Sequence, residues 1–208
     1  MIIKLDNLKK KFYENDGYLT TAEIIEVGYK KWWIQNLIDE GVIERVKRGL
    51  YKLCDDKYFQ LDEEIDIIKM IPMGVFCLSS ALSFHELTTY TPYEHEIAID
   101  RRYKVTVPEY PPIKVYYYDT KYYKLGIQEV LEDGYVIRVY NMEKTLCDCL
   151  RYRNKLSNDI IVEAFKEYMK RKDKNLTLLM EYAKECRVSK IIKIYMEVLI
   201  WQKIYQHQ

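Results

Sequence analysis

Two clusters of basic side chains near the start of the chain are suited to bind phosphate. Lys47 and Arg48 precede Gly49 in the stretch IERVKRGLYKL, residues 43–53. The flanking residues predict two short β-strands, with Gly49 supplying the turn geometry that other residues resist. Lys30 and Lys31 stand near the start of a second segment, YKKWWIQNLIDEG. Cations at a hairpin tip and at the start of a helix can neutralise the phosphates of a nucleic acid.

Amide side chains follow the second cluster and are suited to read bases. Their segment is predicted to be a helix that starts before Lys30 and ends at Gly41. Its apolar stripe includes Trp33, which we expect in the core, whereas Trp32 lies at the edge of that stripe. Gln35 and Asn36 fall largely on the opposite side. A Gln or Asn amide can pair with N6 and N7 of adenine, so this helix is suited to the major groove.

The elements before this helix must position it. Residues 4–14 place apolar residues at helical spacing, and the sequence Asn-Asp-Gly then ends that helix. Thr20 and Glu23 form a capping box, which predicts a helix starting at Thr21 and ending at Gly28. Three short helices followed by a hairpin are the layout of a winged helix-turn-helix domain, assigned to residues 1–54. Such a domain binds DNA through its third helix and its hairpin.

The predicted DNA contacts come from all of these elements. They are Thr20, Thr21, Lys30, Lys31, Trp32, Gln35, Asn36, Lys47, Arg48 and Tyr51. Residues 1–53 hold ten basic and eight acidic residues, so the domain as a whole is only weakly basic. A protein-interaction role for the same fold is therefore a second interpretation.

The rest of the chain predicts an α+β architecture. Residues 55–67 are an acidic linker that turns into a helix near Glu63, and residues 68–208 form a mixed α/β domain with a small sheet and a C-terminal helical block. A short strand and a helix capped by Ser79 or Ser80 open this domain. The predicted strands are 94–100, 103–107, 113–119 and 134–140, and the predicted helices are 141–153, 157–172, 175–186 and 189–202.

Composition limits the classes of function. The 208 residues are 49% hydrophobic and 31% charged with a net charge of +1, so any nucleic-acid site must be a local patch. No apolar stretch is long enough for a membrane span, and the start does not read as a signal peptide. Five cysteines without metal-ligand spacing predict reduced, buried thiols in a cytoplasmic protein. We expect no metal site, no cofactor and no membrane partner.

Four motifs together resemble the AbiEi-type antitoxins of type IV toxin–antitoxin systems. They are GYLTTAEIIEVG, LIDEGVIERVKRGLYKL, SSALSFHELTTYTPYEHEIAI and VYNMEKTLCDCLRYRNKL, in the order of the family, and the resemblance runs from about residue 3 to residue 200. Glu86 and Cys147 depart from the residues that the family often carries there. The resemblance implies a bacterial, cytoplasmic protein of abortive infection, a phage defence, that is not an enzyme.

The resemblance also implies two activities. The N-terminal domain would bind inverted repeats in the protein's own promoter and repress transcription. The second domain would counteract a nucleotidyltransferase-type toxin, with direct contact left open. Basic residues that could meet such a partner are Arg101, Arg102, Lys104, Arg151, Arg153 and Lys155. A solvated helix surface is the alternative interpretation of such residues.

Three other functions remain open at this stage. Asp100, followed by Asp119 and Lys121, matches the skeleton of a metal-dependent restriction-type nuclease. A serine nucleophile paired with His85 is a weaker match, because a hydrogen-bonded, half-buried histidine explains that residue as well. A transcription regulator with no toxin partner is the third alternative.

Overall fold

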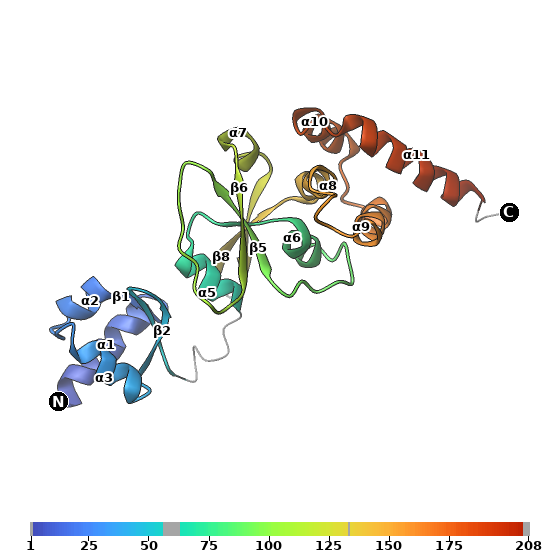
Figure 1. Cartoon of the computed structure of the whole chain (residues 1–208). Helices are drawn as coiled ribbons and strands as arrows, with labels where there is room; N and C mark the ends of the chain where they lie inside the picture. Colours follow the sequence, from blue (N-terminus) through green and yellow to red (C-terminus); the bar gives the residue numbers. More distant parts are fainter. Residues whose placement is uncertain (1, 56–62, 133, 206–208) are drawn as a thin grey trace. The chain divides into compact units, whose positions relative to one another are not determined.

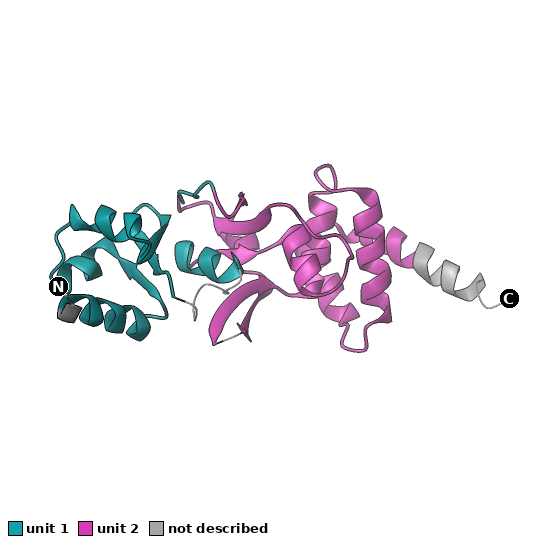
Figure 2. Cartoon of the chain, turned by 90° about the horizontal axis from the view of Figure 1, so that it is seen from below, with its two compact units in different colours: residues 1–72, 105–109 teal, residues 73–104, 110–208 magenta. Residues whose placement is uncertain are grey.

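The computed structural model describes residues 2–55, 63–132 and 134–205. The protein is α+β: its described part contains ten helices, a three-stranded antiparallel sheet and a five-stranded mixed sheet (Figure 1). The chain divides into two compact units, one made of residues 1–72 and 105–109 and the other of residues 73–104 and 110–208 (Figure 2). Residues 56–62 of the predicted linker lie outside the described residues.

The first unit joins short helices to a small sheet. In chain order its elements are α1 (Ile2–Glu14), β1 (Tyr18–Thr20), α2 (Thr21–Glu26), α3 (Trp33–Asp39), β2 (Ile43–Lys47), β3 (Leu50–Leu53) and α5 (Glu63–Met70). The three strands are ordered β1-β3-β2, and both pairs are antiparallel. The helix expected near Glu63 is therefore present as α5, and it packs against β2.

Local sequence explains most of these elements. Leu8 and Phe12 of α1 are fully buried in the core of the unit. The predicted capping box is confirmed: the Glu23 backbone N–H donates to the Thr20 hydroxyl over 3.3 Å, and the Thr20 N–H donates to the Glu23 carboxylate over 2.6 Å. The predicted hairpin is confirmed, with Gly49 at a φ of +87° in its turn.

The start of the third helix was predicted too early. α3 begins at Trp33, so Lys30 and Lys31 lie in the turn before it. Tyr29 is 8% exposed, and its backbone N–H bonds back to the carbonyl of Ile24 at 3.3 Å. The chain therefore has to reverse direction at this point before the helix can start.

The second unit places strands before a block of helices. Its elements are β4 (Val75–Phe76), α6 (Leu78–Phe84), β5 (His95–Asp100), β6 (Ile113–Tyr118), α7 (Thr120–Tyr123), β7 (Ile127–Glu132), β8 (Tyr135–Tyr140), α8 (Met142–Arg151), α9 (Asn158–Lys170), α10 (Leu176–Glu185) and α11 (Ser189–Tyr205). The sheet order is β6-β5-β4-β8-β7, with parallel pairs β5–β6 and β4–β8. Figure 1 shows helices α8 to α11 grouped on one side of this sheet.

Two predictions for this unit are wrong, and one strand was not predicted. Residues 103–107 form no strand, because β5 and β6 are parallel neighbours and the segment between them has to serve as their crossover. The edge strand β7 was missed because it alternates weakly and leaves Leu131 exposed. Ser79 and Ser80 do not cap α6. Both are buried within it, where the Ser79 N–H donates to Glu96 over 2.7 Å and the Ser80 hydroxyl accepts from the Glu96 N–H over 2.8 Å.

Helix α8 forms the centre of the second unit. Its residues from Glu143 to Leu150 are all buried. Lys144 pairs with Asp148 one turn later at 2.5 Å, and both side chains are almost inaccessible to solvent. The ring of Tyr118 stacks with two other tyrosine rings, with centroid distances of 5.9 Å to Tyr140 and 5.6 Å to Tyr152. Some of the 21 tyrosines of the chain therefore pack in the core.

Candidate nucleic-acid interface

Three exposed cations of the first unit lie in two of its turns. Lys30 and Lys31 lie in the turn before the helix, and Arg48 lies at the turn of the β2–β3 hairpin. In the described part of the chain none of the three has a carboxylate partner. The start of α2 lies beside the hairpin turn, because the Thr21 N–H donates to the Gly49 carbonyl over 3.0 Å. These side chains are therefore available to an anionic partner.

Lys47 does not share this position, although the sequence grouped it with Arg48. Its ammonium group donates a hydrogen bond to the backbone carbonyl of Met70, the last residue of α5. The side chain is partly buried, and this burial lowers the pKa of Lys47. The lysine thus joins the hairpin to α5.

Tyr51 is also placed differently from the sequence-based expectation. It is 6% exposed and belongs to the hydrophobic core of the first unit. The guanidinium of Arg45 lies over its ring, 5.9 Å from the centroid. A direct contact between Tyr51 and DNA is therefore not supported by its burial.

The exposed face of α3 presents the two predicted base-reading amides. Gln35 and Asn36 are both exposed. The Gln35 amide donates to the carboxylate of Asp39, one turn further along, over 2.9 Å. Asp39 was not among the predicted site residues. Its spacing of four residues from Gln35 could have indicated it, because residues four apart on a helix are neighbours. This carboxylate orients the amide and places a negative charge on the same face.

The remaining predicted contacts are local caps and an exposed indole. The Thr20 hydroxyl lies 2.7 Å from the Glu23 carboxylate, so the capping box already uses it. Thr21 is half-buried beneath the hairpin turn. Trp32 is 63% exposed, and its ring centroid lies 5.5 Å from that of Trp33. Trp33 packs against the core as expected, whereas the DNA contact of Trp32 stays a prediction.

The predicted partner-binding residues of the second unit do not form one surface. Arg101 and Arg151 line a small pocket of about 80 Å³, where the Arg151 guanidinium lies 3.9 Å from the ring centroid of Tyr122. Lys155 lines another pocket, of about 310 Å³, together with Lys114 and Tyr93. The first pocket lies at the ends of β5 and β6, and the second at their starts.

Two other members of this set, Arg102 and Arg153, have partners within the second unit. The Arg102 guanidinium forms a fork with the Asp100 carboxylate, with distances of 2.8 and 3.1 Å. Arg153, in the turn after α8, donates to the carbonyl of Leu150 near the end of that helix, over 3.1 Å. Lys104 is exposed. Arg151 and Lys155 are exposed, and each lines one of the two pockets.

The carboxylates of the nuclease alternative are both paired with arginines. Asp100 is 2% exposed, and its hydrogen bonds from Arg102 lower its pKa to about 2. Asp119 pairs with Arg101. Across residues 2–55, 63–132 and 134–205, no cluster of three or more His, Cys, Asp or Glu side chains is arranged to hold a metal ion.

The predicted half-buried, hydrogen-bonded histidine is confirmed. His85 Nε2 lies 2.7 Å from the carbonyl oxygen of Tyr140, and burial lowers the pKa of this histidine. Four cysteines are buried free thiols, but Cys54 is exposed, contrary to the expectation for all five. None of the helices described is both long enough and apolar enough to cross a membrane.

Comparison with known proteins adds no assignment. No model of a known protein family matches the chain, and no curated protein matches it.

Proposed function

We propose that the first unit is a winged helix-turn-helix that binds double-stranded DNA. The element order α1-β1-α2-α3-β2-β3 and the strand order β1-β3-β2 support this assignment. The observation that carries it is the position of three exposed cations without carboxylate partners in the described chain: Lys30 and Lys31 before α3, and Arg48 at the hairpin turn. In this arrangement α3 enters the major groove, and the hairpin lies along the phosphate backbone.

The proposed DNA site is an inverted repeat in the promoter of the protein's own operon. Gln35 and Asn36 read bases, whereas the cations fix the position of the domain on the duplex. The protein then represses its own transcription. The resemblance of the four sequence motifs to AbiEi-type antitoxins supports this part of the proposal.

The proposed role of the second unit is to counteract a nucleotidyltransferase-type toxin in the bacterial cytoplasm, as part of abortive infection. The motif VYNMEKTLCDCLRYRNKL supports this role, because it belongs to the resemblance and contains α8, which ends at Arg151, an exposed cation over the Tyr122 ring. Arg151 and Lys155 are the proposed contacts, each in a pocket of its own.

One experiment with two readouts tests both activities on the full-length chain. The protein should bind the DNA upstream of its gene more tightly than shuffled DNA of equal length, and co-expression should protect cells from the product of the adjacent gene. Lys31→Ala/Arg48→Ala should lose DNA binding and keep protection, whereas Arg151→Ala should do the reverse. Lys10→Ala, a change of an exposed lysine on α1, is the matched control. Equal affinity for both DNAs would refute the proposed operator binding, and failure to protect would leave a transcription regulator without a toxin partner.

A further inference from the structure

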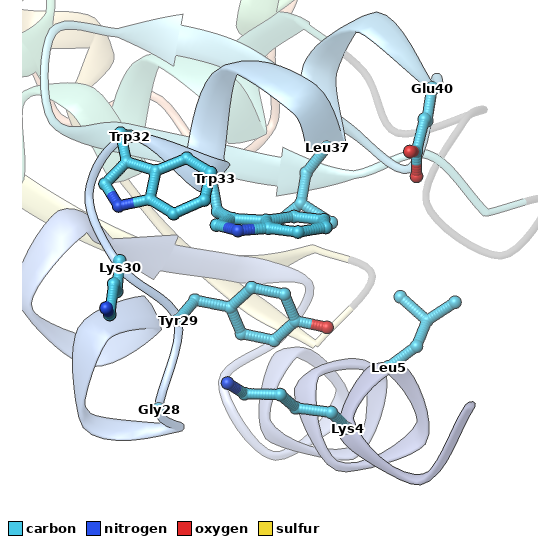
Figure 3. A pocket seen from close by; sticks show the side chains of 9 residues that line it. All are labelled: Lys4, Leu5, Gly28, Tyr29, Lys30, Trp32, Trp33, Leu37 and Glu40. Carbon is cyan, nitrogen blue, oxygen red and sulfur yellow. The ribbon is translucent and has the colours of Figure 1, made fainter. Parts of the chain in front are cut away.

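The first unit contains a pocket that DNA binding does not account for. It measures about 370 Å³, within the range typical of small-molecule sites, and is enclosed by the start of α1, the turn before α3 and one side of α3 (Figure 3). Three aromatic side chains and three charged ones line it: Tyr29, Trp32, Trp33, Lys4, Lys30 and Glu40. Apolar spacing does not predict this pocket, because Lys4 on α1 and Tyr29 in the turn before α3 are far apart in the sequence.

The walls of the pocket favour a planar aromatic ligand. Figure 3 shows the Trp33 indole between Trp32 on one side and Tyr29 on the other. The two indoles are tilted by 44°, with centroids 5.5 Å apart. Trp33 and Tyr29 pack against the core and are therefore held in place, while Trp32 leaves 63% of its surface in water. A flat ring that covers this exposed indole would bury apolar area and gain stacking energy.

The charges of the pocket favour an anionic ligand. Lys4 and Lys30 are both exposed, and neither has a carboxylate partner in the part of the chain that the structure describes. The Lys4 ammonium instead lies over the Tyr29 ring, 5.1 Å from its centroid. Glu40 lines the pocket near the other end of α3, away from Lys30 in Figure 3. A carboxylate next to Lys4 would therefore meet an unpaired cation at the edge of an aromatic wall.

We propose that this pocket binds a small aromatic carboxylate and that its occupation weakens DNA binding. DNA itself could contact Lys30 and Trp32, but a sugar-phosphate backbone would not fill the apolar interior next to Tyr29. A ligand with one or two fused rings fits the volume, and its negative group matches Lys4.

The coupling to DNA follows from shared residues, and this half of the inference rests on the proposed function. Lys30 and Trp32 line the pocket and also belong to the predicted DNA contacts. The turn that carries them leads into α3, whose start has no side-chain cap and is held by a 2.8 Å bond from the Trp33 N–H to the Lys30 carbonyl. A bound anion would occupy these side chains and repel the phosphates. By linkage, DNA must weaken ligand binding by the same factor.

The binding half is tested by calorimetry on the full-length protein without DNA. The probe is 2-naphthoate, compared with its neutral amide, 2-naphthamide, and with the non-aromatic anion cyclohexanecarboxylate. Naphthoate should bind most tightly. Lys4→Gln should weaken it about fivefold through the lost ion pair, and Trp32→Leu about tenfold through the lost stacking. Both side chains are exposed, so these variants should fold. Lys10→Gln, an exposed lysine on the same helix, is the control and should bind as the wild type does.

Several outcomes would overturn the inference. No heat with naphthoate, or equal affinities for Lys4→Gln and Lys10→Gln, would exclude the anion site. A wild-type dimer that Trp32→Leu converts to a monomer, without naphthoate binding, would mean that a second copy of the chain covers the pocket. Naphthoate binding that leaves the affinity for upstream DNA unchanged would refute the coupling. A protein that binds naphthoate but no DNA would refute the proposed function and leave the ligand site standing.

Discussion

The ammonium group of Lys52 on β3 lies 3.2 Å from the carboxylate of Asp66 on α5, and only 5% of the lysine side chain is exposed. The same carboxylate accepts a 2.5 Å hydrogen bond from the Tyr18 hydroxyl on β1. The buried ammonium group of Lys52 thus has its ion-pair partner on α5, a helix that follows the predicted DNA-binding domain in sequence. Helix α5 is therefore part of the folded first unit, together with the sheet that it covers.

Removal of the Asp66 charge should destabilise the first unit. Asp66→Asn leaves Lys52 buried without its main partner, so the free energy of unfolding should fall by about 3 kcal/mol. The Glu44 carboxylate lies 3.9 Å from the Lys52 ammonium group and still offsets part of its charge, so the loss of stability should be no larger than this. Denaturant unfolding followed by circular dichroism measures the loss. Lys52→Met/Asp66→Leu should recover most of it, and Lys69→Met, a more exposed lysine of α5, should cost less than about 1 kcal/mol. A loss for Asp66→Asn no larger than that for Lys69→Met would contradict this account.

Lys47 and Arg48 are neighbours that should behave differently when changed. Arg48→Ala should reduce the salt slope of the DNA association constant by about 0.9, because one phosphate contact is lost. Lys47→Ala should leave that slope unchanged and lower the free energy of unfolding by about 1 kcal/mol, because its ammonium bonds to the Met70 carbonyl. Fluorescence anisotropy over a series of salt concentrations measures the slopes. Equal slopes for the two variants would show that Lys47 leaves α5 when DNA binds.

Lys47 and Arg48 also show which features of the fold and the site the sequence predicts and which it does not. Local rules predicted the capping box at Thr20, the hairpin around Gly49 and the helices after residue 140, because each depends on residues a few positions apart. The contacts of Lys47 and Tyr51 could not be predicted, because their partners, Met70 and the core, are brought to them only by the fold. The crossover after Asp100 was misread as a strand for the same reason, since the order of strands in a sheet is a tertiary property.

Acid should destabilise the second unit through His85. Burial lowers the pKa of this histidine from its usual 6.5, and its Nε2 bonds to the Tyr140 carbonyl. The unfolded chain therefore binds more protons just below pH 6.5, so the free energy of unfolding should fall as the pH drops through that value. Denaturant melts at a series of pH values from about 8 to 5 measure this dependence. His85→Gln keeps a donor for the carbonyl and should flatten the curve. An unchanged slope in that variant would remove His85 as the cause.

The nuclease alternative has a direct test in Asp119. This carboxylate pairs with Arg101, and Asp100 pairs with Arg102, so we expect neither to bind Mg²⁺. Full-length protein incubated with supercoiled DNA and Mg²⁺ should give no cleavage, and Asp119→Ala should bind DNA with wild-type affinity. Cleavage that requires Mg²⁺ and disappears in Asp119→Ala would establish the nuclease, because contamination would persist in the variant.

Gln35 and Asp39 should have opposite effects on DNA binding. Gln35→Ala removes a base contact, so it should cost about 1–3 kcal/mol on the cognate repeat and almost nothing on random DNA. Asp39→Asn removes a negative charge from the exposed face of α3 and should strengthen binding to both DNAs, most at low salt. It also releases the Gln35 amide from the 2.9 Å bond that orients it, so the preference for the cognate repeat should shrink. Anisotropy titrations with both DNAs measure the ratio of affinities. If Gln35→Ala weakens both DNAs equally, α3 does not read sequence through this amide, and the proposed role of the helix would reduce to holding the backbone.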